Sequence, residues 1–85
     1  MVKDIDQFLG TDLDEQIKSL YLNATFIVAI RYYGYKVNLY LIHDHYIEVF
    51  YNHKYDRIEK ISLLDFQHSR MKFYEDQIGI QSLAS

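Results

Sequence analysis

Two histidines and one glutamate in the middle of the chain are the residues whose types and spacing could support chemistry. His43 and His45 are two residues apart, so on an extended strand their side chains would point to the same side. A zinc or nickel site needs three or four converging ligands, and only these two histidines have a suitable spacing. The chain has no Cys, which removes thiolate ligands, disulfides and a cysteine nucleophile together. We therefore predict no metal ligands and no cofactor. Whether His43 and His45 bind a metal is left open by the sequence.

Glu48 is the candidate for acid–base chemistry, because it stands among tyrosines on a predicted strand, where a buried carboxylate could act as a general base. A cross-strand pairing with Arg31 or Lys60 explains the same residue without chemistry. The three glycines are far apart, so there is no Gly-rich phosphate loop, and no Ser-His-Asp pattern stands out. We therefore expect a protein that is not an enzyme and has no catalytic residue.

The length and composition indicate a single domain that spans residues 1–85. Hydrophobic residues make up 49% of the chain and aromatic residues 16%, which excludes a disordered or low-complexity protein. The net charge of −3 argues against a strongly basic surface for nucleic acid or membrane. The first residues lack the pattern of a signal peptide, and the longest apolar stretch, around residues 24–30, is too short to span a bilayer. We expect a soluble cytoplasmic protein.

The first zone of the chain predicts a helix in two parts. Apolar residues recur at helical spacing and form one stripe, which comprises Ile5, Phe8, Leu9, Leu13, Ile17, Leu20 and Tyr21. Gly10 is expected to split the helix, and Thr11 is the predicted N-cap of the main part, residues 12–22. Acidic residues follow Thr11, so the outer face of this helix is expected to be acidic.

The remaining zones predict four strands and a second helix. Residues 24–64 are rich in strand-forming residues, with turn signals at Gly34, at residues 43–45 and at residues 52–57. Each connection is too short for a parallel crossover. Residues 65–77 return to helical spacing, with Gly79 as the C-cap and a tail whose Ile80 and Leu83 could dock on the core. The predicted fold class is α+β: a four-stranded antiparallel meander flanked by an N-terminal and a C-terminal helix.

Alternation along the predicted strands sorts their residues onto two faces. One face is aliphatic and is expected to lie under the helices; it carries Phe26, Val28, Ile30, Val37, Leu39, Leu41, Ile47, Val49, Ile61 and Leu63. The other face is aromatic and half polar, a mixture that suits a protein interface. Its predicted interface residues are Arg31, Tyr33, Tyr40, Tyr46, Glu48, Phe50 and Lys60. If one helix packs on each side of the sheet, several of these residues instead belong to a second core.

The leading functional hypothesis is a small protein-interaction module. It would act through the aromatic face, either by self-association into a homodimer or by binding and inhibiting a partner protein. The alternative is single-stranded nucleic-acid binding by the same tyrosines, although the middle zone sums to a charge of only +1. A small-molecule or catalytic pocket around Glu48 is the third hypothesis.

Four segments resemble a group of small uncharacterised bacterial proteins. They are residues 31–40 (RYYGYKVNLY), 48–52 (EVFYN), 58–61 (IEKI) and 73–78 (FYEDQI). The resemblance extends from about Leu13 to Ile78. It implies a small intracellular bacterial protein of the same helix, meander, helix type. Because that group has no assigned activity, cofactor or partner, the resemblance implies no functional residue.

Overall fold

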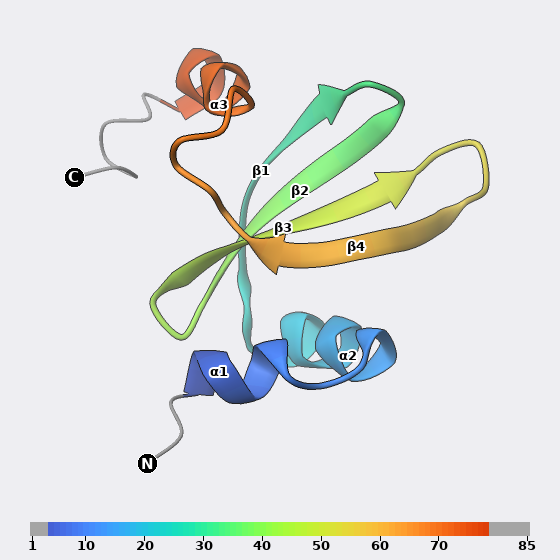
Figure 1. Ribbon diagram of the computed structural model, residues 1–85, viewed down its shortest axis with the longest axis vertical. Helices are drawn as coiled ribbons and strands as arrows, with labels where there is room; N and C mark the ends of the chain where they lie inside the picture. Colours follow the sequence, from blue (N-terminus) through green and yellow to red (C-terminus); the bar gives the residue numbers. More distant parts are fainter. Residues whose placement is uncertain (1–3, 79–85) are drawn as a thin grey trace.

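Four antiparallel strands form the middle layer of the computed structural model, which describes residues 4–78 (Figure 1). The strands are β1 (Thr25–Tyr32), β2 (Tyr35–Ile42), β3 (His45–Asn52) and β4 (Arg57–Leu63), and they lie in the order β1-β2-β3-β4. The helices α1 (Asp4–Leu9) and α2 (Leu13–Asn23) lie on one side of the sheet, and α3 (Met71–Ile78) lies on the other (Figure 1). The predicted α+β class and the four-stranded meander are confirmed.

The break between α1 and α2 falls where Gly10 predicted it, but the N-cap is a different residue. Asp12 has an extended backbone, and its carboxylate accepts a hydrogen bond from the backbone N–H of Glu15 at 2.9 Å. Thr11 instead donates its hydroxyl to the carbonyl of Phe8 at 2.7 Å, at the end of α1. The prediction of Thr11 as N-cap is therefore wrong. Thr and Asp both cap helices well, and Asp12, one residue after Thr11, accepts the free backbone N–H in the first turn of α2.

Each of the first two hairpins turns over two residues. Tyr33 and Gly34 have φ angles of 47° and 83°, and His43 and Asp44 have φ angles of 50° and 62°. Two consecutive residues with positive φ are typical of the type I′ turn, whose twist matches that of the strands it joins. The structure therefore places His45 at the start of β3, opposite Ile42. The turn predicted over residues 43–45 is confirmed at residues 43 and 44, and its extension to residue 45 is wrong.

This turn length decides which side chains share a face of the sheet. With His45 opposite Ile42, Leu39 lies opposite Glu48, and Tyr40 lies opposite Ile47. Directly paired residues point to the same side of the sheet. The predicted faces are therefore wrong for β3 and β4 relative to β2, since Ile47 and Glu48 have exchanged sides.

A separate core lies on each side of the sheet. Under α3 the buried residues are Ile30, Val37, Leu39, Phe50, Leu64, Met71 and Tyr74. Under α1 and α2 they are Ile5, Phe8, Leu20, Ile42, Ile47 and Val49. The apolar stripe of the N-terminal helices is only partly buried, because Tyr21 is exposed and Gln16 is buried in the stripe's middle. Gln16 donates to the carbonyl of Phe8 at 3.2 Å, which ties α2 to α1.

The C-terminal helix is shorter than predicted. It begins at Met71, because residues 66–70 form successive turns between β4 and α3. The predictions for Gly79, Ile80 and Leu83 lie outside the described residues. None of the helices in residues 4–78 is long and apolar enough to cross a membrane.

Gly34 offers a direct test of the first turn. Its φ of +83° disfavours any residue with a Cβ, while no atom lies within 4 Å of where that Cβ would stand. Gly34→Ala should therefore lower the free energy of unfolding by about 1–2 kcal/mol through backbone strain alone. Urea denaturation measures this change. Gly10→Ala is the matched control: its Cβ would meet only ordinary contacts, so an equal loss in both variants would contradict the assignment.

Candidate functional site

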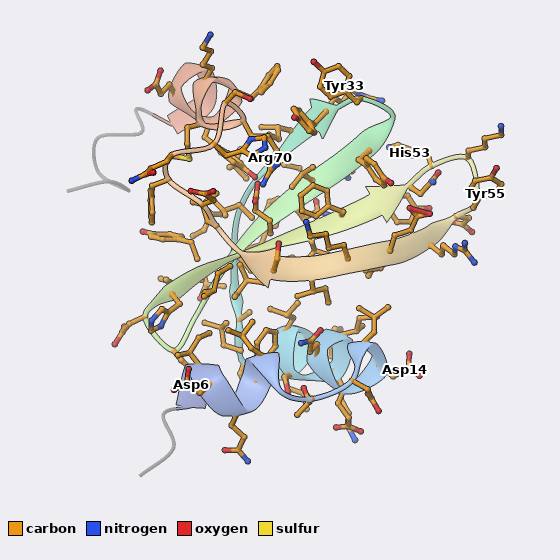
Figure 2. All side chains as sticks on the ribbon, viewed as in Figure 1. Asp6, Asp14, Tyr33, His53, Tyr55 and Arg70 are labelled. Carbon is orange, nitrogen blue, oxygen red and sulfur yellow. The ribbon has the colours of Figure 1, made fainter. Side chains whose placement is uncertain are left out.

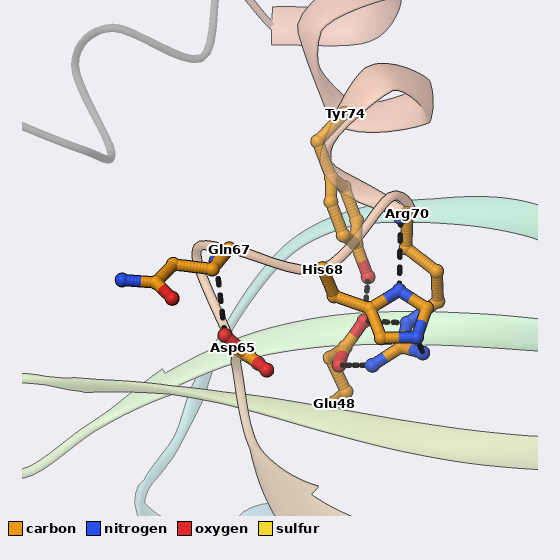
Figure 3. A network of polar contacts seen from close by, with 6 residues as sticks. All are labelled: Glu48, Asp65, Gln67, His68, Arg70 and Tyr74. Atoms are coloured by element: carbon orange, nitrogen blue, oxygen red, sulfur yellow. Dashed lines mark hydrogen bonds and ion pairs between the residues drawn. The ribbon is translucent and has the colours of Figure 1, made fainter.

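A buried carboxylate at the centre of β3 organises the polar groups between the sheet and α3 (Figure 3). Glu48 has no exposed surface. Its Oε1 accepts from Arg70 Nη2 at 2.7 Å, and its Oε2 accepts from Arg70 Nε at 3.0 Å. Oε2 also accepts the hydroxyl of Tyr74 at 2.8 Å. We call Glu48, Arg70 and Tyr74 the buried triad.

Aromatic rings and a histidine enclose the guanidinium of the buried triad. Arg70 lies 5.3 Å from the ring centre of Tyr32 and 5.1 Å from that of Phe50, both within cation–π range. Nδ1 of His68 accepts the backbone N–H of Arg70 at 3.0 Å, which fixes the turn just before α3. The positive group is therefore held by contacts from β1, β3 and the turn that precedes α3.

The pKa values of both donors in the triad reflect this enclosure. The hydrogen bonds that Arg70 donates to Glu48 raise the pKa of the Arg70 guanidinium above its ordinary value, although burial alone would lower it. Burial raises the pKa of Tyr74 well above its ordinary value of 10.0, and the charge of Glu48 raises it further. At neutral pH both donors of the triad therefore keep their protons, Arg70 as a guanidinium cation and Tyr74 as a neutral phenol.

This arrangement gives Glu48 a structural role. Both of its oxygens accept hydrogen bonds from protein donors, and its side chain has no exposed surface to present to a substrate. Within the described part of the chain, every buried side-chain nitrogen and oxygen has a hydrogen-bond partner. The triad thus fastens α3 to β3.

The predicted interface residues do not share one face. Tyr46, Glu48, Phe50 and Lys60 point to the α3 side of the sheet, where Glu48 and Phe50 are buried. Arg31 and Tyr40 point to the α2 side. Tyr33 lies in the first turn and points outward from the tip of the hairpin (Figure 2). The prediction of a single open aromatic face is therefore wrong. Glu48 and Phe50 instead belong to a second core, as expected for a sheet with a helix on each side.

Sequence reasoning missed the cation that pairs with Glu48. Arg31 lies on the other face, and the ammonium of Lys60 lies over the ring of Phe50 at 5.2 Å. Arg70, which is 22 residues further along the chain, is the partner. The available signal was Glu48 itself, since a carboxylate between buried neighbours in a central strand requires a buried cation from another element.

The histidines of the second turn show no converging ligand set. His45 Nδ1 contacts the carbonyl of His43 at 2.7 Å, so the pair interacts locally. No group of three or more His, Cys, Asp or Glu side chains within the described residues could hold a metal ion. A polar hollow of about 370 Å³ lies beside this turn and is lined by Gln7, Phe8, Thr11, Glu15, Ser19 and His43.

An apolar groove lies between α2 and the sheet, close to the start of β1. Its volume is about 280 Å³, and its lining residues are Ile17, Leu20, Tyr21, Ala24, Phe26, Tyr40, Val49 and Ile58. Two of them form its exposed rim: Tyr21 is 88% exposed and Phe26 is 53% exposed. Phe26 packs edge-on against Tyr40, with ring centres 5.6 Å apart. We call this feature the α2–β1 groove.

Comparisons of the chain with protein-family models, curated proteins and solved structures found no match.

Breaking the buried triad on one side should strongly destabilise the fold. Arg70→Met leaves the carboxylate of Glu48 buried without its cation, for which we expect a loss of about 3–5 kcal/mol in the free energy of unfolding. Replacing both charges, in Glu48→Leu with Arg70→Met, should restore part of that loss. Chemical denaturation of the two single variants and the double variant measures the coupling.

Arg57→Met is the matched control for Arg70→Met. Arg57 is 69% exposed in its side chain and lies 3.9 Å from Glu59, so its loss should change stability by less than about 0.5 kcal/mol. Equal effects at Arg57 and Arg70 would show that the buried pair has no special importance.

The raised pKa of Tyr74 predicts a loss of stability at alkaline pH. Above the ordinary pKa of 10.0, the unfolded chain releases this proton while the folded chain retains it, so the free energy of unfolding falls as pH rises. Urea denaturation between neutral pH and pH about 11 should show a shallower decline for Tyr74→Phe, which lacks the ionisable group. Identical declines in both proteins would contradict the assignment.

Proposed function

We propose that this protein is a small non-enzymatic protein-interaction module that binds through the α2–β1 groove and its rim. The observation that carries the proposal is the exposure of large apolar side chains where α2 meets β1. Tyr21 and Phe26 form the rim of the groove, and Leu22, which follows Tyr21 in the chain, is 65% exposed. Contiguous exposed apolar surface on a soluble chain is typical of an interaction site.

The shape and chemistry of the groove favour a protein ligand. A groove of about 280 Å³ is smaller than most small-molecule pockets but has room for a large hydrophobic side chain from another protein. Aromatic residues such as Tyr21 and Phe26 are frequent interface hot spots, because they bury much area and lose little conformational entropy. The groove would therefore take an apolar anchor, and the rim would close around it.

The distribution of tyrosines supports protein binding over nucleic-acid stacking. Base stacking on a sheet requires neighbouring aromatic rings exposed on the same face. Tyr40 and Tyr46 are half-buried and lie on opposite sides of the sheet, and Phe50 is buried. The nucleic-acid hypothesis thus lacks the platform on which it depended.

Site-specific photo-crosslinking tests the proposal. A photoreactive phenylalanine analogue replaces Tyr21 at the rim, and a second protein carries it at Tyr55, an exposed position in the β3–β4 turn (Figure 2). Irradiation in living cells should give a discrete protein adduct at position 21 that position 55 does not give. Adding Phe26→Asp, which places a charge in the groove, should abolish that adduct.

Two results would count against the proposal. One is an adduct of equal yield at positions 21 and 55, which would indicate random collisions. The other is an adduct at position 21 that persists in the folded Phe26→Asp variant, since binding would then not use the groove.

A further inference from the structure

The two edges of the sheet differ in how they are protected. Natural sheets guard exposed edges with charged residues and bulges. The β4 edge has both: it carries Arg57, Glu59 and Lys60, and its register shifts where Glu59 is inserted. The β1 edge also has a bulge, where Ile27 is skipped, but its eight residues include no Gly, Pro or acid, and Arg31 is its single charge. The β1 edge is therefore the one suited to accept another strand.

The register of the first hairpin shows which backbone groups of β1 face outward. Tyr32 and Tyr35 flank a two-residue turn, so they form a hydrogen-bonded pair, and the pairs then alternate along the strands. By this alternation the N–H and C=O groups of Ala29 and Arg31 point away from β2. A strand added at this edge would bind at Ala29 and Arg31.

We propose that a second copy of this chain pairs its β1 antiparallel with this β1, about a two-fold axis at Ala29. This inference rests on the proposed function and names its partner. An antiparallel pair of identical strands is isologous, so one edge with little charge supplies both sides of the interface. The product is a continuous eight-stranded sheet with α3 helices on one side and α1–α2 pairs on the other.

The side chains of β1 fit this register on both faces. On the α3 side, Val28 would lie opposite Ile30 of the second copy, which gives two β-branched pairs. On the α2 side the bulge skips Ile27, so Phe26 would lie opposite Arg31 of the second copy. That contact offers a cation–π pair to Arg31, whose cross-strand neighbour within its own chain is Lys36, a like charge.

The exposed aromatic side chains around β1 supply about half or more of the area that each partner of a dimer buries. Aromatic side chains present about 150–250 Å² each, and a standard interface buries about 800 Å² per partner. Tyr21, Phe26 and Tyr33 are exposed to 88%, 53% and 85%, so they alone offer roughly 340–570 Å². In the antiparallel arrangement the α2–β1 groove of each copy lies beside the far end of β1 of the other copy. The strand pairing and the exposed aromatic side chains thus belong to one surface.

Charge substitution at the two-fold axis tests the proposal. The parent chain should sediment at twice its 10.3 kDa mass, with a concentration-dependent monomer. Ala29→Lys and Ala29→Asp each place two like charges directly opposite one another, which should weaken self-association at least about 10-fold. An equimolar mixture of the two variants should recover the dimer, because the ammonium of one variant then faces the carboxylate of the other. Gln67→Lys, at an exposed turn position, is the control for added charge and should dimerise like the parent.

Each outcome decides the matter. Recovery of the dimer in the mixture, with both variants folded by circular dichroism, supports pairing at Ala29. A parent chain that stays monomeric at every concentration overturns the dimer, and a heterologous photo-adduct at position 21 would then leave the proposed function standing.

Discussion

The carboxylate of Glu48 is enclosed at the middle of a central strand, and the packing of α3 on the sheet depends on it. A buried carboxylate is tolerated only when a cation and further donors surround it. Arg70 and Tyr74 donate three hydrogen bonds to Glu48. Arg70 immediately precedes α3, and Tyr74 lies within it. A helix of eight residues is too short to be stable by itself in water. The same contacts that neutralise Glu48 therefore decide where α3 lies and how residues 66–70 turn.

Local signals predicted the elements of this fold, and a single residue decided the faces. Strand-forming runs, the break at Gly10 and the positive φ of Gly34 are properties of short segments, so the number and order of strands follow from the sequence. Which faces the strands share depends on whether His45 belongs to a turn or to β3. Neither His43 nor Asp44 is a glycine, so the turn has no unambiguous marker of its length. A one-residue change in turn length moves every β3 side chain to the other face.

Only the part of the candidate site that depends on local sequence was predictable. Glu48 stood out from its spacing, whereas its partner Arg70 is distant in sequence and reaches β3 only through the packing of α3. Arg31 and Lys60, the cations nearest by strand alternation, were the natural alternatives. Arg31 lies on the other face of the sheet from Glu48, and the ammonium of Lys60 lies over the ring of Phe50. Pairings between an element and a distant helix are long-range, so spacing alone does not reveal them.

The chain's high aromatic content has two explanations that the structure separates. Tyr32, Tyr35, Tyr46 and Tyr74 pack in the core under α3, so they are part of the fold. Among exposed tyrosines, Tyr55 has cationic neighbours of its own, since Lys54 and Arg57 both lie within cation–π distance of its ring. Tyr21 differs, because it lies with Phe26 beside an apolar groove and an edge strand whose single charge is Arg31. Helices lie on both faces of the sheet, so the groove and the β1 edge are side by side at the end of α2 (Figure 1). A partner that covers this junction would bury both together.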